Sequence, residues 1–400
     1  MAWKYKKLGE LAEVSSGGTP KKSNKDFWNG DIPWYSSGEL NNLHTIAPNE
    51  YITESGLLGS NAKLFPKGSL LIGMYDTAAL KMSILDREGT FNQAIAGVKP
   101  NNEVDLSFIL YAINSIKPEL LKLRRGVRQK NLNQGMIKDI LIPDIPLAEQ
   151  KRIVALLDTV FADLEQTRAK TEKNLKNARE LFESYLQQAF SQKDEGWEEF
   201  SLENLVSEDC SLSYGIVQPG DDFNDGLPVV RPTDLKTELI VPDGLKLIDP
   251  VKSEAYKRTV LQGGELLVCV RGSTGITSIA CKSLAGANVT RGIVPVRFNP
   301  ELISDRFGYY QFISPLVQCQ IKDATYGAAL MQINIRDFRK IKVSTPSIEV
   351  QNLLVNKLDS IKPDLIRAEE IYEQKLLALD ELKKSILQKA FSGELTADAE

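Results

Sequence analysis

A cluster of positive charge lies between Lys117 and Lys130. This stretch holds six lysine or arginine residues against a single acidic residue, Glu119, although the whole chain has a net charge of −4. Gln129, Asn131 and Asn133 stand in or directly after it. Basic side chains neutralise phosphates, and amide side chains hydrogen-bond to base edges. The stretch therefore favours contact with nucleic acid, and a solvated helix end is the alternative interpretation.

Catalytic chemistry finds little support in the sequence. The chain contains neither a [DN]-P-P-[YF] motif of amino-methyltransferases nor a G-x-x-x-x-G-K-[ST] phosphate loop. Asp144 with Glu149 and Lys151 imitates a nuclease core, but Pro146 lies between the carboxylates. Asp364 and Glu373 are nine residues apart, which places them on opposite faces of a helix. We therefore expect no catalytic residues.

Metal binding and secretion are equally unsupported. The four cysteines, Cys210, Cys269, Cys281 and Cys319, show no C-x-x-C spacing, and the only histidine is His44. We expect reduced, mostly buried thiols, no metal site, and a surface or hydrogen-bonded loop position for His44. Because neither a signal peptide nor a run of eighteen apolar residues occurs, the sequence predicts a cytoplasmic protein without membrane contact.

An internal repeat organises the whole chain. The second half follows the first at an offset that grows from 194 to 201, as loop insertions would produce. Trp3 matches Trp197, and Gly68 to Ile72 match Gly264 to Val268. Ala189-Phe190-Ser191 recurs as Ala390-Phe391-Ser392. An ordered series of this kind indicates two copies of one unit, whereas a single match could arise by chance.

The repeat also pairs loops whose residues differ between the copies. Ser36 to Glu39 faces Arg231 to Asp234, and Tyr75 to Lys81 faces Arg271 to Thr274. Arg271 has the geometry to hold guanine through O6 and N7, and Gln93 suits adenine. A packing or loop-capping role is the alternative for each residue. The candidate DNA-binding residues are Ser36, Ser37, Glu39, Tyr75, Thr77, Lys81, Asn92, Gln93, Arg124, Arg125, Arg128, Gln129, Lys130 and Asn131 in the first copy, and Arg231, Thr233, Asp234, Arg271, Ser273, Thr274, Thr290, Arg291, Tyr326, Gln332 and Asn334 in the second.

Each copy combines a globular α+β segment with a long helix. Residues 1–147 and 193–347 mix short strand-like runs with turns, and each carries one helical stretch, interrupted by Pro118 or Pro315. Apolar residues then alternate at spacings of four and three from Leu157 to Ala189 and from Leu354 to Ile386. These stripes predict an antiparallel intramolecular coiled coil, with a kink or restart at Pro363. Ordinary core helices or a homodimer zipper are the alternatives.

Two segments resemble a known family. Residues 143–154 (PDIPLAEQKRIV) resemble the junction between a target-recognition domain and a conserved helix in the specificity (S, HsdS) subunits of type I restriction-modification enzymes. Residues 388–396 (QKAFSGELT) resemble the C-terminal signature of that family, while the second junction, residues 346–351 (PSIEVQ), departs slightly from its pattern. The resemblance covers nearly the whole chain.

The resemblance implies a domain plan and a set of partners. Target-recognition domains would occupy residues 1–147 and 193–347, with conserved helices at 148–192 and 348–395. Each domain would read one half of a split site in double-stranded DNA, and the helices would set the spacer. The helices would also dock methyltransferase subunits, two in number, and restriction subunits would join that core. No cofactor is expected on this chain, since S-adenosylmethionine, ATP and Mg would be bound by the partner subunits.

Two other functions stay open at this point. The chain could guide a methyltransferase without any restriction partner, or it could be a coiled-coil adaptor that binds proteins. The acidic isoelectric point of about 5.5 is compatible with the adaptor hypothesis. The basic stretch that ends at Lys130 counts against it.

Overall fold

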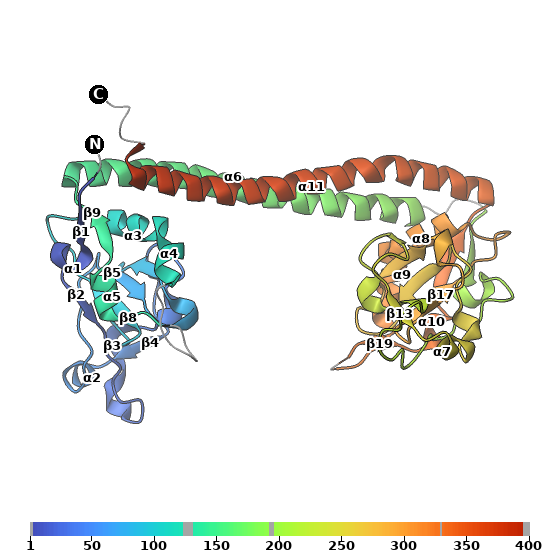
Figure 1. Ribbon diagram of the computed structural model, residues 1–400, viewed down its shortest axis with the longest axis horizontal. Helices are drawn as coiled ribbons and strands as arrows, with labels where there is room; N and C mark the ends of the chain where they lie inside the picture. Colours follow the sequence, from blue (N-terminus) through green and yellow to red (C-terminus); the bar gives the residue numbers. More distant parts are fainter. Residues whose placement is uncertain (1–2, 123–130, 192–195, 329, 395–400) are drawn as a thin grey trace. The chain divides into compact units, whose positions relative to one another are not determined.

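The computed structural model describes residues 3–122, 131–191, 196–328 and 330–394. The chain divides into two compact units, which we describe separately. Unit 1 comprises residues 1–171 and 374–400, and unit 2 comprises residues 172–373. Each unit therefore joins one globular α+β domain to portions of the two long helices (Figure 1).

The domain of unit 1 is built from three small sheets with helices around them. A four-stranded sheet has the order β2-β8-β5-β6, a three-stranded sheet has the order β4-β3-β7, and β1 pairs with β9. The elements are β1 (Tyr5–Lys7), α1 (Leu8–Leu11), β2 (Val14–Ser16), η1 (Lys25–Phe27), β3 (Trp28–Tyr35), η2 (Ser37–Glu39), β4 (Glu50–Ile52), α2 (Glu54–Leu58), β5 (Leu70–Gly73), η3 (Asp76–Ala78), β6 (Met82–Ile84), β7 (Thr90–Phe91), β8 (Ile95–Val98), α3 (Leu106–Ser115), α4 (Lys117–Lys122), α5 (Gln134–Lys138) and β9 (Leu141–Pro143).

Unit 2 repeats this plan. Its four-stranded sheet has the order β12-β15-β14-β17, its three-stranded sheet the order β13-β11-β16, and β10 pairs with β20. The elements are β10 (Glu198–Ser201), η4 (Leu202–Asn204), β11 (Leu227–Val230), η5 (Pro232–Asp234), β12 (Leu239–Ile240), β13 (Lys246–Ile248), α7 (Val251–Glu254), η6 (Lys257–Thr259), β14 (Leu266–Cys269), β15 (Thr277–Ala280), η7 (Lys282–Leu284), β16 (Asn288–Val289), β17 (Ile293–Val296), α8 (Asp305–Ile313), α9 (Pro315–Asp323), β18 (Thr325–Tyr326), β19 (Gln332–Ile333), α10 (Ile335–Phe338) and β20 (Lys342–Thr345).

Strand pairing confirms the predicted repeat. In unit 1, β3 runs parallel to β7 and β5 antiparallel to β8; in unit 2, β11 runs parallel to β16 and β14 antiparallel to β17. The helical stretches are interrupted as predicted. One breaks at Ile116, between α3 and α4, and Pro315 occupies the first turn of α9, where its missing N–H costs no helical hydrogen bond.

The two long helices, α6 (Leu147–Ser191) and α11 (Ile348–Ser392), pair antiparallel within each unit. In unit 1, Arg168 pairs with Asp380, and Lys383 Nζ lies 2.8 Å from Glu165 Oε1. In unit 2, Arg179 lies 3.1 Å from Glu369 and 2.7 Å from Glu373. Early residues of α6 thus meet late residues of α11, and the predicted antiparallel pairing is confirmed.

Of the predicted kink or restart at Pro363, the restart is wrong, because α11 continues through this residue, and the kink stays a prediction. Contacts on neighbouring residues hold the turn in place: Asp359 binds Arg306, and Lys362 binds Glu238. These ion pairs compensate for the helical hydrogen bond that proline removes. In the described part of the chain, no helix is both long enough and apolar enough to cross a membrane.

A buried glutamine joins each domain to its long helix. In unit 1, Gln150 accepts from the Asp105 N–H (2.8 Å) and donates to the Ile145 carbonyl (2.9 Å). In unit 2, Gln351 accepts from the Ser304 N–H (2.9 Å) and donates to the Pro346 carbonyl (2.9 Å). These identical arrangements fix the start of each helix on its domain.

The exposure of the cysteines and of the histidine can be compared with the predictions. All four cysteines are free thiols, but only Cys269 is buried, so the prediction of mostly buried thiols is wrong. Cys319 lies on the exposed face of α9, where its sulfur contacts Asp323. His44 is exposed and forms a β-bridge with Ile84, which agrees with the predicted surface position.

Candidate nucleic-acid interface

Backbone hydrogen bonds bring the divergent loops of unit 2 together at one edge. Thr290 N donates to Val230 O (2.9 Å), which joins the loop after β16 to the loop after β11. Val270 N donates to Gly292 O (2.8 Å), and Ile333 N donates to Val270 O (2.9 Å). The loops that carry Arg231, Arg271, Arg291 and Gln332 are therefore neighbours.

Unit 1 gathers the matching loops with the matching bonds. Asn92 N donates to Tyr35 O (2.9 Å), Met74 N to Ala94 O (2.8 Å), and Leu132 N to Met74 O (2.8 Å). This edge collects predicted residues from all of the loop pairs, including Asn131. Five further predicted residues lie outside the described residues: Arg124, Arg125, Arg128, Gln129 and Lys130.

Several of the predicted residues hold the loops in shape. Glu39 accepts from the N–H and the hydroxyl of Ser36, both at 2.7 Å, and from the Asn49 N–H at 2.9 Å. Asp234 accepts from the N–H (2.7 Å) and the guanidinium of Arg231 (2.8 and 3.0 Å). Asn334 caps α10 by accepting from Arg336 N at 2.9 Å. These carboxylates and amides position their neighbours, as the loop-capping alternative expected.

The side chains of other predicted residues already form hydrogen bonds within their own unit. The Thr290 hydroxyl donates to the Val230 carbonyl (3.4 Å), and the residue is only 8% exposed. Gln93 accepts a hydrogen bond from Thr19. Lys81 donates to Asn41 Oδ1 at 3.0 Å. A base or phosphate would have to compete with these bonds.

A third group is free to meet a ligand. Among the described residues, neither Arg271 nor Arg291 forms an ion pair, and Arg291 is exposed. Tyr75 in unit 1 and Tyr326 in unit 2 are 38% and 49% exposed. Ser37, Thr77, Thr233, Ser273 and Gln332 are also at least partly exposed on these loops, as is Thr274, whose hydroxyl accepts from the Thr325 hydroxyl (3.2 Å). Cations, amides and hydroxyls on a fixed backbone edge are the groups that contact phosphates and base edges.

Sequence reasoning missed one segment of each edge. Gly18 N donates to Phe91 O (2.9 Å), and Ile216 N donates to Val289 O (2.8 Å), so residues 17–19 and 215–217 border the loops after β7 and β16. A Cβ on Gly17 would lie 2.0 Å from Phe91 O, and one on Gly215 1.9 Å from Val289 O. Glycine is therefore required at both positions. The presence of glycine at matching positions in the two copies was the sequence signal that could have identified this segment.

Three of the four carboxylates that imitate a nuclease core form ion pairs. Asp144 lies 2.9 Å from Lys6, Glu149 lies 2.8 Å from Arg152, and Glu373 lies 2.7 Å from Arg179. Among the described residues, no group of three or more histidine, cysteine or acidic side chains is arranged to hold a metal ion.

Comparison with known proteins identifies the family. The model for the type I restriction modification DNA specificity domain matches residues 2–174 and 195–376. The chain is 25% identical to the EcoBI specificity subunit of Escherichia coli, covering 95% of this chain and 81% of that protein. It is 23% identical to the MjaIX specificity subunit of Methanocaldococcus jannaschii, covering 99% and 94%.

Solved structures share the fold. A chain of a type I restriction-modification system, described for its complex assembly and conformational transition, matches with a TM-score of 0.77 at 18% identity, over 98% of both chains. The HsdS subunit from Thermoanaerobacter tengcongensis matches with a TM-score of 0.57 at 17% identity, over 98% of this chain and 97% of that one. Two copies of the family domain, each with its own loop edge, account for the repeat: the chain belongs to the family of DNA specificity subunits of type I restriction-modification systems.

Proposed function

We propose that each unit reads one half of a bipartite DNA site through its loop edge and that the chain itself catalyses nothing. The observation that carries this proposal is the contrast between constant backbone and variable side chains. Equivalent hydrogen bonds hold both edges, yet Tyr75 stands where the other edge carries Arg271, and Ser36 where it carries Arg231. Such a platform can present different donors and acceptors to different half-sites.

The long helices are the proposed docking surface for methyltransferase subunits. Leu181 on α6 and Leu382 on α11 are related by the repeat and are 44% and 46% exposed. Leu353, Ile371 and Leu377 on α11 are 70%, 56% and 59% exposed. Apolar residues that stay exposed after the helices have paired fit a further protein contact. The repeat favours two such subunits, which would supply S-adenosylmethionine chemistry, while restriction subunits would bring ATP and Mg.

Methylome sequencing tests this function directly. Cells that express the chain with its neighbouring methyltransferase should acquire methyladenine in a split motif, and cells with the methyltransferase alone should not. Exchange of the domain of unit 2 for that of a relative should change one half of the motif and leave the other intact. No new methylation from a purified, assembled complex would contradict the proposal.

Removal of the two unpaired arginines of unit 2 should weaken DNA binding. We expect Arg271→Ala with Arg291→Ala to lower the affinity of the assembled enzyme and to reduce the slope of log K against log salt by up to about 2, one for each lost phosphate contact. Fluorescence anisotropy with a labelled duplex at several salt concentrations measures both. Lys282→Ala, an exposed change on η7 of the same unit and outside the long helices, is the control. An unchanged affinity and slope would place the DNA elsewhere.

A further inference from the structure

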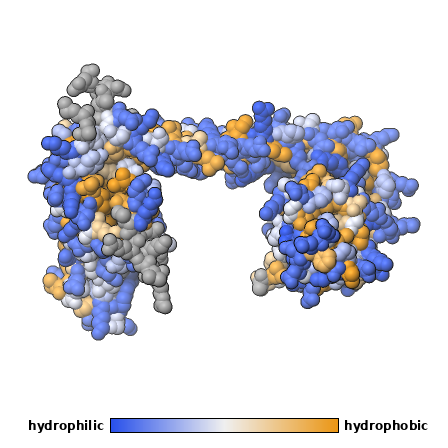
Figure 2. Space-filling model, viewed as in Figure 1, coloured by the Kyte–Doolittle hydropathy of each residue, from blue (hydrophilic) through white to orange (hydrophobic). Residues whose placement is uncertain are grey.

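Unit 1 contains a cavity of about 900 Å³ beneath its paired helices. It lies between residues 40–43, the start of β6, helix α3, and the portions of α6 and α11 that belong to this unit. Its apolar lining comes from Leu40, Leu43, Leu80, Met82, Leu110, Phe161 and Leu387. Apolar surface is visible on this unit just below the helices (Figure 2). Volumes of this size are typical of small-molecule sites.

The repeat identifies the corresponding place in unit 2. Ile84 N donates to Leu43 O (2.8 Å), and Ile279 N donates to Glu238 O (2.7 Å), so Leu43 corresponds to Glu238. The two glutamine junctions match Asp105 with Ser304 and therefore Ser107 with Arg306. Tyr111 donates to Asp158 as Tyr310 does to Asp359, which matches Phe161 with Lys362. Three positions can thus be compared one by one.

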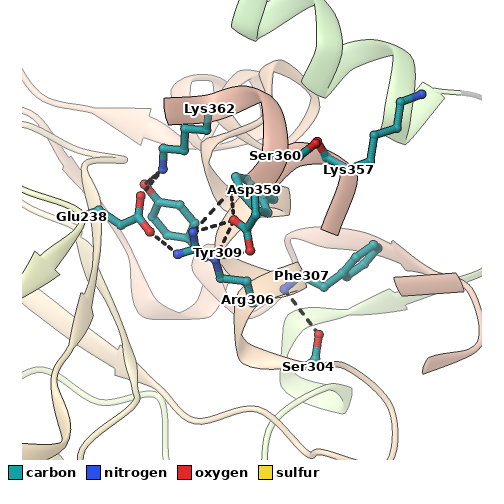
Figure 3. Close-up of polar contacts among 10 residues, drawn as sticks. Glu238, Ser304, Arg306, Phe307, Tyr309, Lys357, Asp359, Ser360 and Lys362 are labelled. Carbon is teal, nitrogen blue, oxygen red and sulfur yellow. Dashed lines mark hydrogen bonds and ion pairs between the residues drawn. The ribbon is translucent and has the colours of Figure 1, made fainter. Parts of the chain in front are cut away.

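In unit 2 these three positions form a closed polar network (Figure 3). Glu238 binds both Arg306 and Lys362. Arg306 also lies 2.6 Å from Asp359, and Lys362 Nζ lies 3.3 Å from the Tyr309 hydroxyl. Burial opposes the ionisation of Glu238, but the hydrogen bonds from Lys362 and Arg306 outweigh it and lower its pKa. The network ties the loop before β12 to α8 and α11.

In unit 1 the same positions are Leu43, Ser107 and Phe161, which cannot form these bonds. Leu43 is 43% exposed. The loop of residues 40–43 is therefore not tied to α3 and α6 by ion pairs, and the space between them is open. The difference between the copies lies in the side chains, since the backbone hydrogen bonds are conserved.

The charges around the cavity are unbalanced. Two of its three carboxylates pair with cations, Glu165 with Lys383 (2.8 Å) and Asp380 with Arg168, while Asp158 keeps its charge and accepts from the Tyr111 hydroxyl (2.5 Å). By contrast, within the described ranges neither Lys117 nor Lys384 has an ion-pair partner, and Lys81 contacts only the Asn41 amide. Burial and the nearby Lys81 ammonium lower the pKa of Lys117. An anion at this rim would relieve that repulsion.

We propose that this cavity binds a small amphipathic anion, with an apolar body against Leu110 and Phe161 and a negatively charged head near Lys81 and Lys117. The site would exist only in unit 1, because the Glu238 network occupies the equivalent place in unit 2. This inference does not depend on DNA recognition, and binding can be measured on the full chain without DNA.

Titration with 8-anilinonaphthalene-1-sulfonate tests the site. The chain provides its own closed variant, in which Leu43→Glu, Ser107→Arg and Phe161→Lys recreate the network of unit 2. The wild-type chain should bind one more equivalent of the probe than the closed variant does. Probe molecules on exposed helix leucines bind to both chains, so they do not affect this difference. Lys117→Gln should weaken that site several-fold. N-phenyl-1-naphthylamine has nearly the same aromatic body but no sulfonate. This neutral probe should bind to the cavity more weakly than 8-anilinonaphthalene-1-sulfonate does.

Circular dichroism establishes whether the closed variant folds, and if it does not, Lys117→Gln and the neutral probe decide alone. Where the closed variant folds, loss of one equivalent together with either a several-fold weakening by Lys117→Gln or a preference for the anion supports the site. Where it does not fold, either of the latter two results supports it. Equal stoichiometry in wild-type and closed chains overturns it. An unchanged affinity in Lys117→Gln with equal binding of both probes overturns it as well.

Discussion

Replacement of Gln351 by leucine should lower the free energy of unfolding of unit 2 by about 3 kcal/mol. The side chain is fully buried and makes hydrogen bonds to Ser304 N, Leu302 O and Pro346 O at 2.8–2.9 Å. Leucine keeps the volume but leaves three backbone groups without partners, and each unsatisfied buried group costs about 1–3 kcal/mol. Because the three share one side chain, the total should be less than their sum.

Hydrogen exchange measures this loss where it occurs. Backbone amides of α8 and β20 should lose protection in Gln351→Leu, while those of α3 should not. Gln150→Leu should do the reverse, because Gln150 serves the junction of unit 1. Gln188→Leu, an exposed change on α6, is the matched control and should shift stability by less than about 0.5 kcal/mol. Equal protection in Gln351→Leu and Gln188→Leu would contradict the assignment.

The architecture could be predicted because its signals are local. The short strand-like runs of the two copies form strands such as β5 and β17, and the four-three spacing from Leu157 to Ala189 lies within α6. Because of the repeat, each of these patterns occurs in both copies, and the two occurrences support the same interpretation. Proline at position 118 or 315 also marks where a helix must break or begin. Strand order within the sheets could not be predicted, because short strands of similar composition do not indicate which strand pairs with which.

Side-chain partners distant in sequence could not be predicted. Glu238 meets Lys362 across 124 residues, and no local pattern relates the two. The same limit explains Pro363, whose helix continues because distant groups hold the neighbouring turns. Glu39 and Asp234 are a different case, because they bond to residues only three positions away and the sequence left a DNA contact and a loop-capping role as alternatives for both. Loop position was predictable, whereas the division between capping and exposed residues required the fold.

Four residues inserted into both long helices should lengthen the spacer of the recognised DNA site by one or two base pairs. Four helical residues add about 6 Å, and a base-pair step is about 3.4 Å. Under the proposed function the helices separate the two half-site readers, so the added length must appear between the half-sites. Insertion after Thr171 in α6 and after Glu373 in α11 leaves the Arg168–Asp380 and Arg179–Glu369 pairs on either side intact.

Four residues are also close to one helical turn, so the apolar seam stays near the same face and both helices can still pair. The methylome of cells carrying this variant should therefore show unchanged half-sites around a longer spacer. Insertion of the same four residues after Ser392, where α11 ends, is the control and should leave the spacer unchanged. A variant that methylates with the original spacer would mean that the domains, rather than the helices, set the separation of the half-sites.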